Sequence, residues 1–430
     1  MTNNIFKTVN SVNQLGISKD AQGLSKRMVQ VRSSIPIGAN WATTTEIQFE
    51  FQCSGNQWWS PSESYYIISS SLSQGDGTIL IAGTDDTGWA LNAFSGLFSK
   101  AQHHIQNEMV SESNHPARED TCIKRLSLST AYRNSTGSAQ SLQPLQTDRE
   151  ASAVRAIRQT YYYQPKMLSI YNYEGLIPQA RHRTTFQKVS GTDWQLQTVE
   201  AAAGTNRVFS GGAGDLASNI HDIVFYAAIY EGSENTSNQV LLDLDEFKCR
   251  IVNGGVLTEQ NHYLNVEPST TKLALAVQGV ALGTNSHLPI TNFTSNTADA
   301  SQAEDIISKV RLDYANQTFP TYPYEATNGI VNGTTARTST RLFIDTALGV
   351  DAENSAAGAE SETNWMNSGP IMVFPVVKNS DDRSTSVNIQ MNFSAAPTSN
   401  TNLLLFNQYR KVAQLQYDNG ELQQVSVSEI

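Results

Sequence analysis

Few groups of side chains in the sequence have the types and spacing needed for catalysis or metal binding. His103 and His104 are adjacent, and a pair of imidazoles is a common part of a metal site. On a β-strand, however, neighbouring side chains point to opposite faces, so these two cannot bind one ion. We therefore predict no metal site at His103-His104.

The remaining candidate motifs are incomplete. Asp243 and Asp245 share one face of a predicted strand, but no third oxygen ligand or calcium-loop glycine follows, so we interpret them as a solvated face. The glycine-rich run from Ser210 to Gly214 lacks the Gly-Lys-Ser/Thr of a phosphate-binding loop. No Gly-x-Ser-x-Gly or His-Glu-x-x-His motif occurs. We predict no catalytic, cofactor-binding or metal-binding residues and no enzyme, although sites assembled from distant loops are defined by geometry and stay open.

Aromatic clusters are the other candidate binding residues. Stacking platforms for sugars or bases, and anchors of a core or an interface, both use Tyr and Trp. The clusters lack interleaved Lys and Arg, which argues against nucleic acid. We favour packing in the core or at an interface over a glycan site for three clusters: Trp58-Trp59 with Tyr65-Tyr66, Tyr161-Tyr162-Tyr163, and Phe319 to Tyr324.

The composition describes a folded chain with a polar, weakly charged surface. The 430 residues carry a net charge of −11 and only 16% are charged, which does not suit strong direct binding to nucleic acid. The first residues lack a secretory signal, and no apolar run reaches the ~20 residues of a transmembrane helix. An odd number of cysteines in apolar patterns predicts buried, reduced thiols and a reducing compartment: Cys53, Cys122 and Cys249.

Short strands separated by turn residues dominate the chain. Roughly sixteen can be counted, which predicts an all-β fold of two consecutive eight-stranded jelly-roll barrels with a few short helices. We place an N-terminal arm at 1–40, the first barrel at 41–255 and the second at 256–430. Helices are predicted from Pro116, from the capping box Thr147 to Glu150, and along the apolar stripe from Ser301 to Tyr314. Among the predicted strands are Met167–Tyr171, Ile220–Tyr230, Val240–Val252 and Arg341–Thr346.

Three segments carry a family resemblance. Alternation from Ile47 to Cys53 predicts a half-buried strand. Leu97-Phe98-Ser99 then opens a strand, and a second strand with Asn107 follows before a turn at 111–114 and the helix from Pro116. Near the end, an alternating strand closes in Phe393-Ser394, a small-residue turn with Pro397 follows, and Leu403–Tyr409 returns as a closing hairpin. These segments resemble the double jelly-roll major capsid proteins of DNA viruses, including virophages, Polinton-like and adenovirus-like relatives.

The resemblance implies a structural function. A member of this family would form homotrimeric, pseudo-hexagonal capsomers that build the icosahedral shell of a DNA virus. It would be located in the virion, with copies of itself and penton or minor capsid proteins as partners and no cofactor. The alternative that we keep is a carbohydrate-binding or spike-like β-sandwich attachment protein, which would expose an aromatic strip and form no shell.

Overall fold

The computed structural model describes most of the strands and part of the connections. The described residues are 24–38, 41, 43–73, 87–89, 92–128, 136–140, 158–189, 196–198, 217–232, 238–279, 293, 307–325, 329–331, 334–336, 340–349, 371–374, 376, 384–393, 396, 400–418 and 420–429. The predicted helix after Thr147 and the glycine run at 210–214 lie outside them. Within the described residues, no helix is both long and apolar enough to cross a membrane.

The N-terminal part forms a sandwich of two antiparallel sheets. One sheet has the order β1 (Ser25–Arg32), β11 (Ala217–Glu231), β3 (Gln57–Ser73) and β7 (Gln159–Tyr163), with β8 (Ile177–Pro178) on β3. The facing sheet has the order β2 (Glu46–Gln52), β9 (Arg181–Lys188), β5 (Phe98–Ile105) and β6 (Glu108–Ser113). Strand β1, which belongs to the predicted N-terminal arm, pairs with β11 along its whole length.

The C-terminal part repeats this arrangement. One sheet has the order β12 (Gln239–Gly255), β21 (Thr401–Asp418), β14 (Thr270–Gly279) and β19 (Met372–Phe374), with β22 (Glu421–Glu429) on β21. The other has the order β13 (Glu259–Asn265), β20 (Ser386–Phe393), β15 (Ile307–Tyr314) and β16 (Gln317–Glu325). Two short pairs complete the strands: β4 (Thr87–Trp89) with β10 (Leu196–Thr198), and β17 (Gly329–Val331) with β18 (Thr334–Ala336).

Both sandwiches have the same topology. If the eight main strands of each are numbered along the chain, one sheet reads first, eighth, third, sixth and the other second, seventh, fourth, fifth. This interleaving of early and late strands is the jelly-roll order. The predicted fold class, two consecutive eight-stranded jelly rolls, is confirmed.

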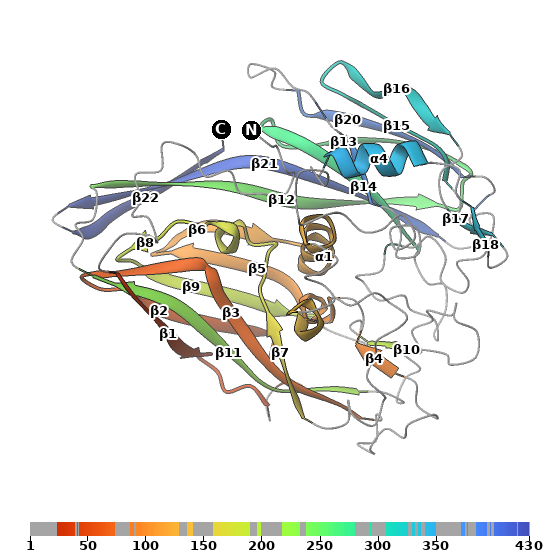
Figure 1. Ribbon diagram of the computed structural model, residues 1–430. Coiled ribbons are helices and arrows are strands. Elements are labelled where there is room, and N and C mark those ends of the chain that lie inside the picture. The colour runs from red at the N-terminus through yellow and green to blue at the C-terminus, as the bar shows by residue number, and fades with distance from the viewer. Residues whose placement is uncertain are drawn as a thin grey trace.

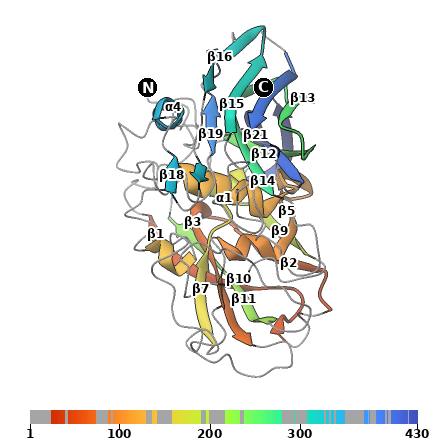
Figure 2. The same cartoon turned by 90° about the vertical axis from the view of Figure 1, so that its right-hand side faces the viewer.

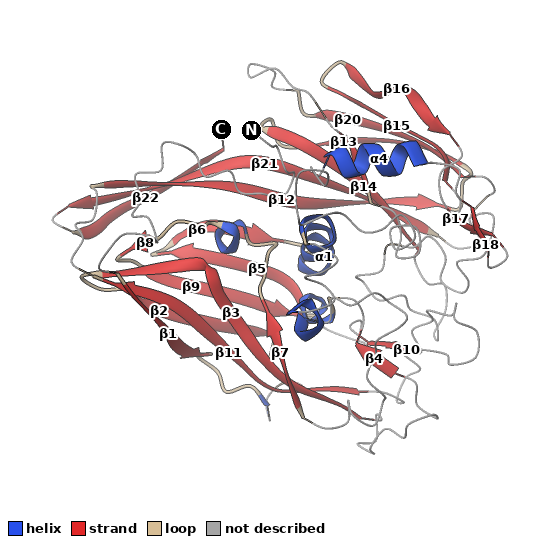
Figure 3. Ribbon diagram, viewed as in Figure 1, coloured by secondary structure: helices blue, strands red, loops and turns tan. Residues whose placement is uncertain are grey.

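The four sheets lie in layers (Figure 1). Viewed from the side, the two sandwiches stack on one another (Figure 2), and strands make up most of the ribbon (Figure 3). The sheet of β12, β21, β14 and β19 lies in the interior and is buried on both faces. Leu404 and Phe406 pack in the cluster shared with the first barrel, while Leu403 and Leu405 pack in the core of the second. This double burial explains why β21 contains a continuous apolar run instead of an alternation.

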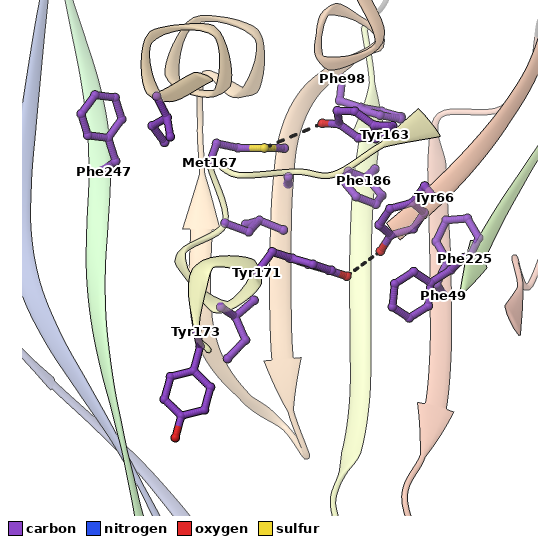
Figure 4. Packing of buried hydrophobic residues seen from close by; sticks show 14 of the residues in the cluster. Phe49, Tyr66, Phe98, Tyr163, Met167, Tyr171, Tyr173, Phe186, Phe225 and Phe247 are labelled. Carbon is purple, nitrogen blue, oxygen red and sulfur yellow. Dashed lines mark hydrogen bonds between the residues drawn. The ribbon is translucent and has the colours of Figure 1, made fainter. Parts of the chain in front are cut away.

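Aromatic rings fill the first barrel (Figure 4). Tyr66 is fully buried, and its hydroxyl lies 2.7 Å from that of Tyr171. Its ring lies 4.7 Å from that of Phe225 and 5.4 Å from that of Phe186. Each such ring pair adds ~1 kcal/mol beyond the burial of area, so this cluster is a large part of the barrel's stability.

Two α-helices are described. Helix α1 (Pro116–Ser127) begins at the predicted residue, because a proline at the first helical position has the required φ and lacks only an N–H that would be unpaired. Helix α4 (Thr340–Gly349) replaces the strand predicted at Arg341–Thr346. Over 341–346, where its side chains are described, Leu342 and Thr346, four residues apart, are the buried ones. Three short 3-10 helices are also present: η2 (Ala93–Leu97), η3 (Thr136–Gln140) and η4 (Ser169–Asn172).

Four other local predictions are wrong. The apolar stripe that predicted a helix to Tyr314 is strand β15, in which buried Val310, Leu312 and Tyr314 alternate with polar residues. Met167–Tyr171 ends in η4 and is not a strand. The turn predicted at 111–114 begins too early, because β6 continues through Ser113. Strands β20 and β21 do not form a closing hairpin, because the chain crosses there from one sheet of the jelly roll to the other.

Candidate functional site

Helix α1 lies between the two barrels and carries an unusual set of buried charged side chains. Glu119, Asp120, Lys124 and Arg125 are each at most 2% exposed. Glu119 in the first turn and Lys124 and Arg125 in the last turn have the signs that the helix dipole favours. Burial of this many charges requires specific partners, and these partners connect the helix to both barrels.

An internal ion pair anchors α1 to the first barrel. Lys124 Nζ lies 2.7 Å from Asp120 Oδ2 and donates to Asn92 Oδ1 at 3.2 Å. Asn92 Nδ2 donates to Asp120 at 3.0 Å, and the backbone N–H of Met167 donates to the other carboxylate oxygen at 3.2 Å. Burial lowers the pKa of Lys124, and the charge of Asp120 opposes this effect. Lys124 also lies 4.9 Å from the centre of the Tyr163 ring.

Glu119 connects the same helix to the second barrel. Strand β12 is the edge strand of its sheet, so alternate N–H groups point away from β21. Glu119 Oε1 accepts one of them, the N–H of Cys249, at 2.8 Å, and the Ser113 hydroxyl donates to Oε2. Burial raises the pKa of Glu119 to about 8, although both hydrogen bonds oppose the rise. At neutral pH this side chain is mainly a neutral acid.

Further polar contacts cross the junction. Ser169 Oγ, in η4, donates to Glu246 Oε1 on β12 at 3.0 Å. Burial raises the pKa of Glu246, with Lys411 opposing the rise from 4.0 Å. Arg118 Nε, on α1, donates to Gln278 Oε1 on β14 at 2.9 Å. The two barrels are therefore fixed to one another by buried hydrogen bonds as well as by apolar packing.

A second charged group lies beside the junction, between β12 and the connection from β13 to β14. Glu267 Oε1, in that connection, lies 3.1 Å from Lys248 Nζ and 2.8 Å from Arg250 Nη2 on β12. Its other oxygen accepts from Asn407 Nδ2 at 2.6 Å. Burial alone would raise the pKa of Glu267, but Lys248, Asn407 and Arg250 outweigh it and the pKa is lowered. This carboxylate is therefore ionised at neutral pH, unlike that of Glu119.

The predicted separation of His103 and His104 is observed. His103 points into the first barrel, where Nδ1 lies 2.9 Å from Thr184 Oγ1 and the ring stacks on Trp59 with centres 5.1 Å apart. Burial lowers the pKa of His103, and that of its neighbour His182 to about 3, so both are neutral core imidazoles. His104 is only partly buried, on the opposite side of β5. Among the described residues, no group of three or more His, Cys, Asp and Glu side chains could hold a metal ion.

The two aspartates on β12 are not a simple solvated face. Asp243 is 9% exposed and accepts from both Arg410 Nε, at 2.8 Å, and Arg410 Nη2. Burial and the charge of Asp243 raise the pKa of Asp245 to about 6. The pair therefore belongs to a cross-strand ion pair with β21.

Most of the aromatic candidates are core residues. Trp58, Trp59, Tyr66 and Tyr163 are at most 2% exposed, and the predicted burial of Cys53, Cys122 and Cys249 as free thiols is confirmed. Three other tyrosines stack on the outer face of the first barrel: the Tyr65 ring lies 4.9 Å from Tyr162 and 5.4 Å from Tyr226. Phe319 packs against the second core, and the side chains of 321–325 lie outside the described part.

Sequence reasoning missed the buried polar residues of the junction. The spacing of Asp120 and Lys124, four apart on a predicted helix, was the one local signal for an ion pair. Nothing local marks Glu119 as the partner of Cys249, 130 residues away. Glu246 likewise has no distinguishing pattern beside Asp245.

Comparison with known proteins supports the fold and gives no match in sequence. No protein-family model matches the chain, and no curated protein matches it significantly. Solved structures match over nearly its whole length. The Sputnik virophage structure aligns with a TM-score of 0.57 at 11% identity and covers 97% of this chain and 91% of that chain.

Two further similar structures are described as major capsid proteins. The Faustovirus major capsid protein has a TM-score of 0.51 at 9% identity, covering 95% of this chain and 92% of its own. The mavirus major capsid protein has a TM-score of 0.50 at 8% identity, with 93% and 90% covered. At such low identity the likeness establishes the fold, and the resemblance to double jelly-roll proteins is confirmed at that level.

Proposed function

We propose that this chain is a major capsid protein that assembles with copies of itself into the icosahedral shell of a DNA virus. The observation that carries the proposal is the repeated jelly roll, shared over nearly the full length with two structures described as major capsid proteins. Its role would be structural, in the virion, without catalysis. Penton or minor capsid proteins would be its other partners, and assembly would take place in a reducing compartment of the host cell.

The arrangement of the sheets supports assembly into rings. Inside one chain, the sheet that contains β6 in the first barrel faces the sheet that contains β12 in the second, with α1 and η4 contacting β12 between them (Figure 1). The two outer sheets are the counterparts of these inner ones: β1-β11-β3-β7 corresponds in strand order to the sheet of β12, and β13-β20-β15-β16 to the sheet of β6. If the outer sheets of two copies meet, the two types of sheet that face one another inside the chain also face one another between chains. Such a head-to-tail contact builds a closed ring when the rotation closes. We propose a homotrimer, in which six barrels complete a pseudo-hexagonal capsomer.

The side chains of these outer faces suit a contact between proteins. The first barrel presents the partly exposed Tyr65, Tyr162 and Tyr226. The second presents polar side chains such as Arg311 and Asn388, both bonded to Asp313. Tyrosine buries a large ring and keeps a hydroxyl for hydrogen bonding, so it is enriched at interfaces. An aromatic face that meets a polar face can therefore use both parts of the side chain.

Strand pairing also bears on the domain limits, which stay a prediction. We propose a first barrel from Ser25 to Glu231 and a second from Gln239 onward. The pairing of β1 with β11 and of β12 with β21 favours these limits, in place of the limits 41–255 and 256–430 that the sequence predicted.

The attachment-protein alternative needs an exposed aromatic strip. Trp58 and Trp59 are 1% and 0% exposed and cannot provide it, so its candidate among the described residues is the partly exposed group Tyr65, Tyr162 and Tyr226. Size-exclusion chromatography with light scattering tests the trimer, and electron microscopy of the same fractions tests for the shell that an attachment protein would not form. We expect three times the chain mass of 47.1 kDa, and a stable monomer at micromolar concentration would contradict the trimer.

A further inference from the structure

A cleft of about 620 Å³ opens beside the junction of the barrels. It lies between the start of α1 and the strands β12 and β13. Its lining includes His115 and Glu119 from the first barrel, Lys248, Arg250 and Ile251 from β12, and Tyr263 from β13. Its β12 and α1 side lies at the junction, whereas Tyr263, which pairs with Asn388, also belongs to the outer sheet face proposed for assembly.

Two sheet edges flank the cleft. Strands β12 and β13 are the terminal strands of the two sheets of the second barrel. The N–H of Cys249 points away from β21, toward Glu119, and residues two apart on a strand point the same way, so the N–H and C=O of Ile251 also face the open side. On β13, the N–H of Val266 donates back to Thr385 beside β20, so the backbone of Tyr263 faces the open side. An extended peptide can add to such an edge through main-chain hydrogen bonds.

The charge of the cleft is positive on an acidic protein. Lys248 and Arg250 share the single carboxylate Glu267, whereas the whole chain has a net charge of −11. Burial lowers the pKa of His115 and raises that of Glu119 to about 8, so both are mainly neutral at pH 7. The two cations therefore carry one positive charge more than the ionised carboxylate that they share, and this charge remains for an anionic group.

An exposed aromatic side chain lines the cleft. Tyr263 is 71% exposed, the largest exposed fraction among the large apolar side chains of the described residues. An exposed aromatic beside a charged pocket is typical of a site where a partner docks.

We propose that this cleft binds an extended acidic segment of a partner protein. A Glu or Asp side chain of the segment pairs with Arg250 and Lys248, its main chain adds to the β12 edge at Ile251, and its apolar side chains pack on Tyr263. The choice of a different protein over a second copy rests on the proposed function, in which copies meet through the outer sheet faces. The peptide-binding chemistry does not depend on it.

A pair of synthetic peptides tests the proposal on the purified full chain. The probe is a fluorescent peptide of about ten alternating Thr and Val residues with one central Glu, and the matched probe has Lys in its place. We expect the Glu peptide to bind with a Kd below about 1 mM and the Lys peptide to bind at least about tenfold more weakly. Equal binding of the two peptides, or no saturable binding of the Glu peptide, would overturn the proposal.

Three variants locate the binding. Arg250→Gln removes the charge, and Ile251→Pro removes an edge N–H that does not pair with β21, a position where proline is tolerated. Each should weaken binding of the Glu peptide at least about tenfold. The control Arg341→Gln on α4 should leave this binding unchanged. If Ile251→Pro does not fold, slower amide exchange at Ile251 of the wild type on peptide addition takes its place, and unchanged exchange counts against the proposal.

Light scattering of the same samples separates this proposal from the trimer. The Arg250→Gln variant should have the same oligomeric mass as the wild type but should no longer bind the Glu peptide tightly. Dissociation of the assembled wild type by the Glu peptide would show that a second copy occupies the cleft, and would overturn the assignment to a different protein. A monomeric wild type that still binds the Glu peptide would contradict the trimer and leave the peptide site standing.

Discussion

Substitution of Glu119 by Gln should make the protein more resistant to alkaline conditions. The carboxyl group is 1% exposed and bridges α1 to the Cys249 N–H of the second barrel. Glutamine has nearly the same shape, can accept the same N–H through its carbonyl oxygen, and never ionises. The variant therefore removes the titration of this group while it keeps the contact.

The sign follows from the direction of the pKa shift. Burial raises the pKa of Glu119 from 4.5 to about 8, so between these pH values the folded chain holds a proton that the unfolded chain has released. The stability of the wild type therefore falls as pH rises through this window and levels off above it. At ~1.4 kcal/mol per pH unit, the rise from 4.5 to about 8 corresponds to roughly 5 kcal/mol.

The assay is urea unfolding of the wild type and Glu119→Gln from pH 4 to 9 at one protein concentration. Groups common to both proteins cancel in the difference between their free energies of unfolding. We expect this difference to favour the variant increasingly between pH 4.5 and about 8 and to be constant above about 8.

Glu267→Gln is the matched control, because the pKa of Glu267 is lowered. Its ionised form stabilises the fold, so this variant should be less stable than the wild type by a constant amount from pH 9 down to about 5, and the deficit should shrink only below pH 4.5. A Glu119→Gln difference that is flat across the window would refute the assignment of a buried neutral acid. A difference of opposite sign would mean that the ionised form is the one stabilised at the junction.

Three further variants test separate parts of the structure. Lys124→Met leaves Asp120 buried without its cation and should cost about 3–5 kcal/mol in urea unfolding; a loss below about 1 kcal/mol would show that the pair does not anchor α1. Tyr171→Phe removes the hydroxyl that lies 2.7 Å from that of Tyr66 and should cost about 1–2 kcal/mol, with no change of oligomeric mass. Tyr226→Arg places a charge on the outer tyrosine face and should lower the mass measured by light scattering with little change in Tm. An unchanged trimer would exclude that face from the contact.

The sequence predicts the strands that have one polar face, and also the continuous apolar run of β21. The prediction is wrong where the buried residues fit the period of a helix as well as that of a strand. Strand β2 is predicted because Ile47 and Phe49 alternate with exposed polar residues. In β15, the buried residues Ile307, Val310 and Tyr314 also fit a helical stripe, and only the inward Leu312 shows the period of two. Local pattern alone could not decide between them.

The junction could not be predicted for a different reason. Its key contacts join residues that are 77 and 130 positions apart, Ser169 with Glu246 and Glu119 with Cys249. Burial raises the pKa of both carboxyls, and burial is a property of the packed barrels. Their roles therefore appear only once the sheets are in place.

The central claim is that the chain builds a shell, and electron microscopy of the purified chain under conditions of assembly tests it most directly. Closed particles tiled with hexagonal units, each with six barrel-sized densities from three chains, are the predicted result. Discrete monomers or simple trimers that never tile, under any condition of salt and pH that preserves the fold, would contradict the capsid assignment.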